Sequence, residues 1–100
     1  MKTSELTGAA LNWAVNYAEG LTNMLAPVNY CGKWEFGGPI IDRERIGIDC
    51  DDQGVWFASF DLSAETALGA SALTPLIAAM RCYVASKLGD DVDVPEELTK

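Results

Sequence analysis

The sequence predicts an α+β domain, in which two amphipathic helices pack on a small antiparallel β-sheet that contains a hairpin. Three observations lead to this fold class. Apolar residues recur with helical spacing near both ends of the chain, over Leu6–Leu21 and over Thr74–Leu88. Between these segments, over Ile46–Phe60, glycine, aromatic and β-branched residues replace the helical period. Two helices that cover one face of a sheet would bury both apolar stripes in one core.

The chain of 100 residues is long enough for one domain and one hydrophobic core, so we treat 1–100 as a single domain. Its 49% of hydrophobic residues is typical of a globular protein that folds without a metal or disulfide, and we expect no cofactor. The three cysteines, Cys31, Cys50 and Cys82, are odd in number, widely spaced and without a C-x-x-C pair. We therefore expect thiols in a reducing compartment.

The first predicted helix covers Leu6–Leu21. Its apolar stripe consists of Leu6, Ala10, Trp13, Ala14, Tyr17, Ala18 and Leu21. Thr3, Ser4 or Thr7 can cap the N-terminus, and Gly20 can adopt the left-handed conformation that ends a helix.

The second predicted helix has clearer boundaries. Thr74 is an N-cap, and Pro75 stands at the first helical position, where its missing N–H costs no hydrogen bond. The apolar stripe then consists of Leu76, Ile77, Met80, Val84 and Leu88. Lys87 and Gly89 complete the end of the helix, and Tyr83 is expected at the edge of the stripe.

The central region predicts a β-hairpin. Residues Ile46–Cys50 and Val55–Phe60 have strand-like composition, and Asp51–Gly54 between them supplies a turn with glycine at its left-handed position.

The turn also resembles the first half of a calcium-binding loop. Asp49, Asp51 and Gln53 alternate ahead of Gly54, as oxygen ligands do in such loops. The twelfth position of the loop is Phe60, where a glutamate is needed, and the flanks predict strands where helices are required. We favour the hairpin turn and keep a weak divalent site as the alternative.

The remaining segments carry weaker signals. Asn23–Phe36 predicts an irregular connection, and Pro39–Arg45 predicts an extended edge segment whose alternating charges suit an exposed border. Val92 and Val94 alternate with aspartates in a short extended stretch, and Pro95–Leu98 could begin one helical turn.

The charge balance is acidic, with 15 acidic and 7 basic residues and a formal net charge of −8. Such a surface repels nucleic-acid phosphates and anionic lipid headgroups over about 8 Å at physiological salt. We therefore expect no direct binding to nucleic acid or to a membrane. A basic protein partner or a metal would suit this charge, although net acidity also simply keeps proteins in solution.

The sequence lacks the residues of several common chemistries. It contains no histidine, so Ser-His and Cys-His nucleophile pairs cannot be assembled from this chain. Gly37-Gly38-Pro39 lacks the lysine and the spacing of a phosphate-binding loop, and a turn or a close backbone approach explains these glycines better.

Two groups of carboxylates could act as acids or bases if burial separated their pKa values: Asp42 with Glu44, and those within Asp90–Asp93. We expect them to be solvated. A cationic neighbour, Arg81, could activate the thiol of Cys82, but a buried and inert cysteine is more common in such a position. We therefore assign no residue a catalytic role and none a metal-binding role from the sequence.

The three tryptophans, Trp13, Trp34 and Trp56, are expected in the core, although aromatic residues also dominate binding hot spots. Trp34 lies in a glycine-bearing connection and is the one most readily placed on the surface. A recognition patch could form around it. The candidate binding residues are Tyr30, Trp34, Phe36 and Arg43.

Three blocks of the sequence carry a family resemblance. They are Thr74–Asp90 continuing through Val94–Leu98, Glu5–Val15 with Glu19-Gly20, and Trp34 with Gly37–Glu44. Together these blocks resemble NinX-like proteins, small accessory proteins of tailed bacteriophages and prophages whose function is unknown. The resemblance implies a phage or prophage product that acts in the cytoplasm of the infected bacterium, and it implies no catalytic residue.

The function that we expect is a non-enzymatic protein-interaction module, which binds a host or phage protein or forms a homodimer. In one version, its carboxylates imitate DNA phosphates and occupy a DNA-binding protein. The alternative is a small-molecule binder or an enzyme that uses carboxylates or Cys82 in a pocket between helices and sheet. Residues Met1–Glu5 lack the features of a secretion signal, and no apolar run could span a bilayer, so we expect a cytoplasmic protein.

Overall fold

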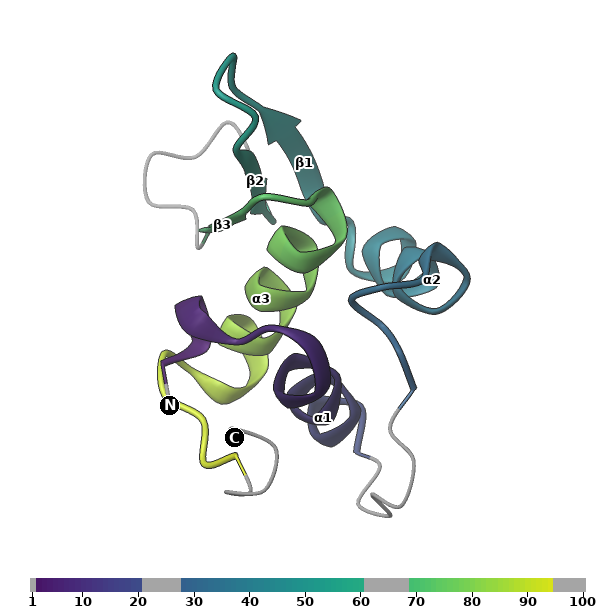
Figure 1. The fold of residues 1–100 in the computed structure, drawn as a ribbon. Helices are drawn as coiled ribbons and strands as arrows, with labels where there is room; N and C mark the ends of the chain where they lie inside the picture. Colours follow the sequence, from purple (N-terminus) through teal and green to yellow (C-terminus); the bar gives the residue numbers. More distant parts are fainter. Residues whose placement is uncertain (1, 21–27, 61–68, 95–100) are drawn as a thin grey trace.

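The computed structural model describes residues 2–20, 28–60 and 69–94 (Figure 1). The helical elements are the 3-10 turn η1 (Thr3–Glu5) and the α-helices α1 (Gly8–Ala18), α2 (Trp34–Glu44) and α3 (Pro75–Leu88). The strands are β1 (Gly47–Cys50), β2 (Trp56–Ser59) and β3 (Gly69–Ala72). The α+β prediction is confirmed, and the described residues form three α-helices and a three-stranded antiparallel sheet.

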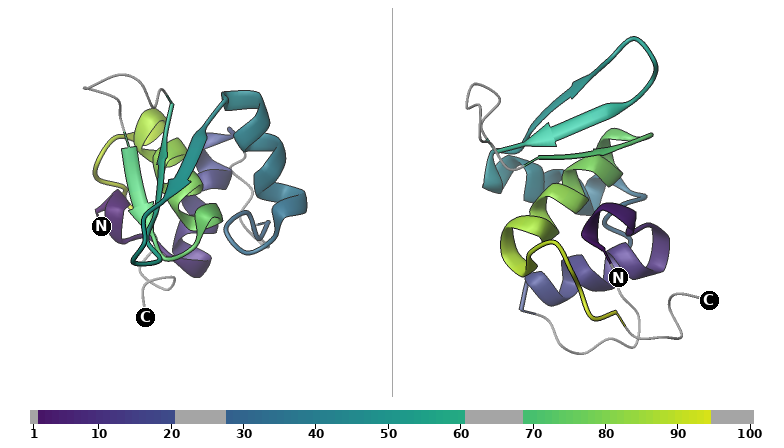
Figure 2. Two further views of the ribbon diagram at one scale, coloured as in Figure 1. Left: turned by 90° about the horizontal axis from the view of Figure 1, so that it is seen from above. Right: turned by 90° about the vertical axis from the view of Figure 1, so that its left-hand side faces the viewer.

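Helix α3 lies at the centre of the fold. The sheet, in the order β1-β2-β3, covers one side of α3, and α1 packs on the other side (Figure 1, Figure 2). Helix α2 lies beside α3 and leads into β1. Because α3 has neighbours on several sides, it is buried around most of its circumference. Its buried residues are Leu76, Ala78, Ala79, Met80, Cys82, Tyr83 and Val84. Tyr83, predicted at the edge of the apolar stripe, is only 2% exposed and belongs to the core.

The ends of α3 agree with the sequence prediction. The hydroxyl of Thr74 accepts a hydrogen bond from the backbone N–H of Ile77 at 3.2 Å, and Pro75 occupies the first helical position. Gly89 ends the helix with a φ of 85°. The N-cap satisfies one of the backbone donors that a helix leaves unpaired at its start.

The predicted hairpin is confirmed. Strands β1 and β2 pair antiparallel, with Cys50 opposite Trp56 as the last pair before the loop. The carboxylate of Asp51 accepts hydrogen bonds from the backbone N–H groups of Gln53 and Val55, both at 2.9 Å, and Gly54 adopts the expected left-handed conformation. Among the residues that the structure describes, no group of three or more histidine, cysteine, aspartate or glutamate side chains is placed to hold a metal ion.

The prediction for Pro39–Arg45 was wrong. We expected an extended edge segment, but α2 extends from Trp34 to Glu44 and includes Pro39 in its interior. The end of the predicted connection, from Trp34 to Phe36, is also helical, while residues 23–27 lie outside the described part. Helix α2 buries Gly37 and Ile40, and ends at Arg45 in the left-handed conformation. Burial against α3 therefore outweighs the poor helix propensity of glycine and proline.

Helix α1 is shorter than predicted, and its buried face is rotated. Leu11 and Val15, which the predicted stripe omitted, are fully buried together with Ala10 and Ala14. Trp13 is half-buried, and Tyr17 is 49% exposed. Both aromatic residues therefore lie at the margin of the buried face and not at its centre.

The segment before α2 is fastened to α1 by polar side chains inside the protein. Asn12 accepts a hydrogen bond from the backbone N–H of Cys31 at 3.0 Å. The hydroxyl of Tyr30 donates to the side-chain carbonyl of Asn16 at 3.1 Å. These bonds satisfy groups that would be costly to bury alone.

The residues after α3 return along the N-terminal turn. The hydroxyl of Thr3 donates to the carbonyl of Gly89 at 2.6 Å, and the backbone N–H of Thr3 donates to the carbonyl of Asp90 at 2.8 Å. Asp91 forms an isolated antiparallel bridge with Lys2, as expected for a short extended stretch. The helical turn predicted for Pro95–Leu98 lies outside the described residues.

All three cysteines lie in the described part of the chain, and none of them forms a disulfide. No helix in that part is both long enough and apolar enough to cross a membrane.

Candidate functional site

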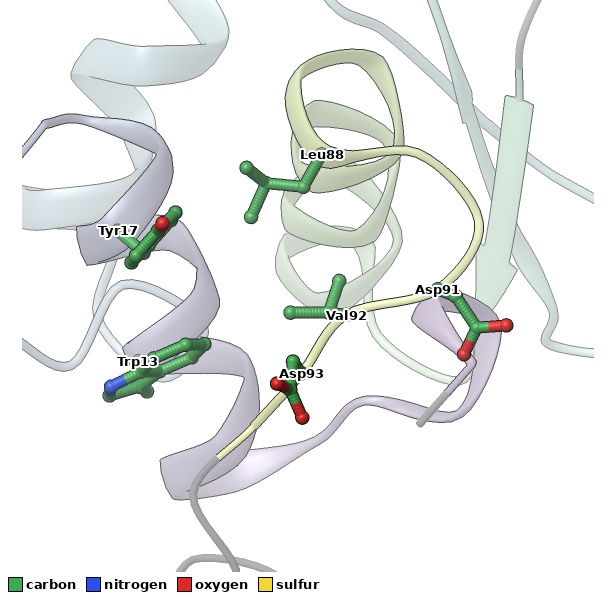
Figure 3. A pocket seen from close by; sticks show the side chains of 6 residues that line it. All are labelled: Trp13, Tyr17, Leu88, Asp91, Val92 and Asp93. Atoms are coloured by element: carbon green, nitrogen blue, oxygen red, sulfur yellow. The ribbon is translucent and has the colours of Figure 1, made fainter.

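The candidate site is a surface groove between α1 and the segment that follows α3 (Figure 3). It has a volume of about 380 Å³. Its lining residues are Trp13, Tyr17, Leu88, Asp91, Val92 and Asp93. We refer to these six residues as the aromatic–acidic groove. Its walls come from the two ends of the chain, so the groove exists only in the folded protein.

One wall of the groove is a pair of stacked aromatic rings. Trp13 and Tyr17 are four residues apart on α1, a spacing that places side chains on the same face of a helix. Their ring centroids are 5.3 Å apart with an interplanar angle of 26°. Trp13 packs against the core, whereas about half of Tyr17 faces solvent. The pair is therefore a fixed apolar surface that is open to a ligand.

The opposite wall combines apolar and acidic residues. The chain turns at Gly89, and Val92 then points inward and is buried, whereas Asp91 and Asp93 are exposed. In Figure 3, Leu88 and Val92 point toward the aromatic pair, and Asp91 points away from it. The charged residues that line the groove are both carboxylates, so the groove suits a ligand with an apolar body and a positive charge.

The four binding residues expected from the sequence do not lie in this groove. Tyr30 is buried against α1, and its hydroxyl is bonded to Asn16. Trp34, 53% exposed, and Phe36 lie on the first turn of α2, so the expectation that Trp34 belongs to the core was wrong. Arg43 lies in the last turn, roughly 13 Å farther along the helix axis. Trp34 and Phe36 thus share the first turn of α2 but, two residues apart, point to different faces, and Arg43 lies in the last turn. The structure does not bring the four residues together, and their role in binding stays a prediction.

Arg43 belongs to a polar cluster that joins the three helices. Its guanidinium binds the carboxylate of Glu19 through two hydrogen bonds and that of Glu44 through a third at 2.9 Å. The hydroxyl of Tyr83 also donates to Glu19, and the Tyr83 ring lies under the Arg43 and Lys87 cations. These contacts connect the helices to one another, so we assign the cluster a structural role.

The cluster changes the acidity of its members. Burial alone would raise the pKa of Glu19, but hydrogen bonds from Arg43 and Tyr83 outweigh burial and lower it. Burial, and then the hydrogen bond to Glu19, raise the pKa of Tyr83. With these shifts Glu19 stays charged and Tyr83 stays neutral at neutral pH, and these are the forms in which Tyr83 donates a hydrogen bond to Glu19.

Cys82 is fully buried in α3, and burial raises the pKa of its thiol to about 11. At neutral pH this thiol keeps its proton, and a protonated thiol is a poor nucleophile. Cys82 is therefore not an activated cysteine.

The groove was missed from the sequence, although its parts carried signals. The spacing of Trp13 and Tyr17 predicts a buried stripe, and the alternation around Val92 predicts a short extended segment, but neither pattern indicates that the two segments meet. What the sequence lacked was the return of the chain after Gly89, which places Val92 opposite Trp13.

The fold and the groove define a small, histidine-free α+β protein with an aromatic surface groove. The sequence model of the family described as Bacteriophage P22, NinX matches residues 26–87, more than half of the chain. The chain therefore belongs to this phage family, whose function is unknown. No curated protein matches the chain. The matched residues include α2, the sheet and most of α3, whereas Trp13, Tyr17 and Val92 lie outside them.

Proposed function

We propose that this NinX-family protein is a non-enzymatic protein-interaction module, and that its aromatic–acidic groove binds a basic segment of a host or phage protein. The observation that carries this proposal is that the Trp13–Tyr17 stack, with about half of Tyr17 exposed, lines the same groove as two aspartates.

The groove suits lysine and arginine side chains for two physical reasons. Their hydrocarbon stems can pack on apolar surface while the charged end stays near water, and the faces of Trp and Tyr rings attract cations. The net charge of −8 would accelerate the encounter with a basic partner. A second copy of this chain carries the same charge, so a different, basic protein fits the groove better than a homodimer.

The proposal can be tested with short peptides and nuclear magnetic resonance. A basic peptide, acetyl-Lys-Leu-Arg-amide, should shift the resonances of Tyr17, Leu88 and Val92 in a saturable way, whereas acetyl-Glu-Leu-Glu-amide should not. The variant Tyr17→Ala should weaken binding of the basic peptide several-fold, since truncation of an exposed aromatic anchor costs about 1 kcal/mol or more.

Phe57→Ala is the matched control for this experiment. Phe57 is an aromatic residue of β2 with an exposure similar to that of Tyr17, and it lies outside the groove. Its truncation should leave the affinity for the basic peptide unchanged. Equal binding of the two peptides, or equal loss in both variants, would contradict the proposed role of the groove.

The second candidate function is binding of a small molecule between helices and sheet. One observation favours it: a cavity at that place is lined by Arg81 together with apolar residues. The group present is a cation, so this candidate no longer depends on carboxylates or on Cys82.

A further inference from the structure

A second cavity, separate from the aromatic–acidic groove, lies where β3 leads into α3. Its volume is about 370 Å³. Its lining residues are Thr7, Val55, Ser71, Ala72, Leu73, Ile77 and Arg81. We refer to it as the Arg81 cavity. It lies beside Ala72, at the opposite end of β3 from Gly69.

The polar centre of this cavity is Arg81. Its Nε donates to the carbonyl of Leu6 at 2.8 Å, and its Nη1 donates to the carbonyl of Ser71, also at 2.8 Å. A guanidinium has five N–H donors in a flat fork, so these two bonds orient the group without using all of its donors. The carbonyls fix the direction of the guanidinium and do not neutralise its charge.

The charge of Arg81 has no acidic counterpart among the described residues, since none of their carboxylates lies within 4.0 Å of it. Partial burial lowers the pKa of this guanidinium, because removal from water disfavours its charged form.

The walls of the cavity are largely apolar. Leu73 is 79% exposed, the highest value among the large hydrophobic residues of the described part of the chain. Val55 and Ile77 line the same cavity and are only partly buried. The hydroxyl of Thr7 makes no capping bond to α1 and so adds a polar group to the rim.

We infer that the Arg81 cavity binds an aliphatic carboxylate, with the acid group on the guanidinium of Arg81 and the hydrocarbon chain against Val55, Leu73 and Ile77. An ion pair with two hydrogen bonds is the geometry in which guanidinium and carboxylate bind best. The hydrocarbon chain would remove Leu73 from water. One ligand thus accounts both for the charge of Arg81, which pairs with no carboxylate among the described residues, and for the exposed leucine.

Two sources could supply this chemistry: a free short-chain acid, or the C-terminal carboxylate of a protein that ends in an aliphatic residue. Isovalerate represents the first, and the peptide acid acetyl-Ala-Leu the second. For each probe the corresponding amide, isovaleramide or acetyl-Ala-Leu-amide, has nearly the same shape without the charge.

At least one acid should shift the amide resonances of Leu73 and Ile77 with a Kd on the order of 1 mM. Its amide should bind at least about tenfold more weakly, because it lacks the charge that pairs with Arg81. Binding of isovalerate alone assigns a small acid, binding of the peptide alone assigns a protein terminus, and binding of both supports the shared chemistry. Equal binding of acid and amide, or no saturable shift by either acid at about 10 mM, overturns the inference.

Variants of residues that line the cavity test whether the acid binds there. Arg81→Gln should abolish the preference for acid over amide, and retention of that preference in the folded variant overturns the inference. Since Arg81→Gln also removes donors from two carbonyls, Leu73→Ser provides a second test at an exposed position. It should weaken binding of the acid about threefold or more, by loss of apolar contact, and an unchanged Kd contradicts the proposed wall. Lys87→Gln removes a cation from the same helix outside the cavity and should leave the Kd unchanged.

Discussion

The carboxylate of Glu19 and the guanidinium of Arg43 form a two-bond ion pair, with Nη1 3.1 Å from Oε1 and Nη2 2.8 Å from Oε2. Glu19 caps the C-terminal end of α1, and Arg43 lies in the last turn of α2. A carboxylate is poorly placed at the negative end of a helix dipole unless a cation compensates it. The pair therefore holds two helices together and offsets an unfavourable charge.

Replacement of Glu19 by glutamine should destabilise the protein. Glu19→Gln keeps the shape of the side chain but removes the negative charge of the carboxylate to which Arg43 and the hydroxyl of Tyr83 both donate. Because the side chain of Arg43 is half-exposed, we expect a loss of about 1 kcal/mol in the free energy of unfolding, measured with urea. Glu35→Gln, at an exposed position of α2, should change it by less than about 0.5 kcal/mol. Equal losses in the two variants would contradict a special role for Glu19.

The same ion pair predicts a loss of stability in acid. The pKa of Glu19 is lower in the folded protein than its ordinary value of 4.5, so the unfolded chain takes up the proton first. The stabilisation is complete above the unfolded pKa and disappears as the pH falls through the folded pKa. The urea midpoint of the wild-type protein should therefore fall more steeply below about pH 5 than that of Glu19→Gln. Parallel profiles would show that Glu19 does not contribute to the acid transition.

Cys82 predicts a loss of stability in alkali. Burial raises the pKa of its thiol from 9.0 to about 11, so above pH 9 the unfolded chain releases a proton that the folded protein keeps. Stability is complete below the unfolded pKa and declines as the pH rises toward the folded value, by up to about 3 kcal/mol. Cys82→Ala should be less stable at pH 7, because it leaves a cavity, yet lose less between about pH 9 and pH 10. In the presence of a reductant, Cys50→Ala, at an exposed position, should keep the wild-type slope.

The elements that the sequence predicted well are those whose local signals and tertiary surroundings agree. Thr74-Pro75 and Gly89 mark the ends of α3 through their own local preferences. The side chain of Asp51 closes the hairpin turn that ends at Gly54. None of these features depends on a distant residue. They could therefore be read directly from neighbouring positions.

The features that were missed depend on tertiary contacts. The Arg81 cavity and the aromatic–acidic groove each combine residues from both ends of the chain, and no local pattern shows that those ends meet. Strand β3 consists of small residues with no strand preference of their own, and its pairing with β2 determines its conformation. Helix α2 was also missed. It contains two glycines and a proline, although Gly37, Ile40, Ile41 and Glu44 follow the spacing of one helix face.

The last prediction concerns the two glycines of α2, which are adjacent but not equivalent. A Cβ on Gly37 would lie 2.5 Å from Cδ1 of Leu76 and 2.5 Å from the backbone carbonyl oxygen of Tyr30. A Cβ on Gly38 would meet only the ring of Trp34, at 3.9 Å. Gly37→Ala should therefore destabilise the protein by about 1–3 kcal/mol through overpacking. Gly38→Ala should be neutral or stabilise it by up to about 1 kcal/mol, because alanine is the better helix former.

Urea unfolding of the two alanine variants tests this contrast directly, since both add the same methyl group to the same helix. If Gly37→Ala is as stable as Gly38→Ala, then α2 does not approach α3 as closely as the structure places it. The expected asymmetry would show why this helix tolerates glycine in its interior: the residue that weakens the isolated helix is the one that lets its backbone reach Leu76.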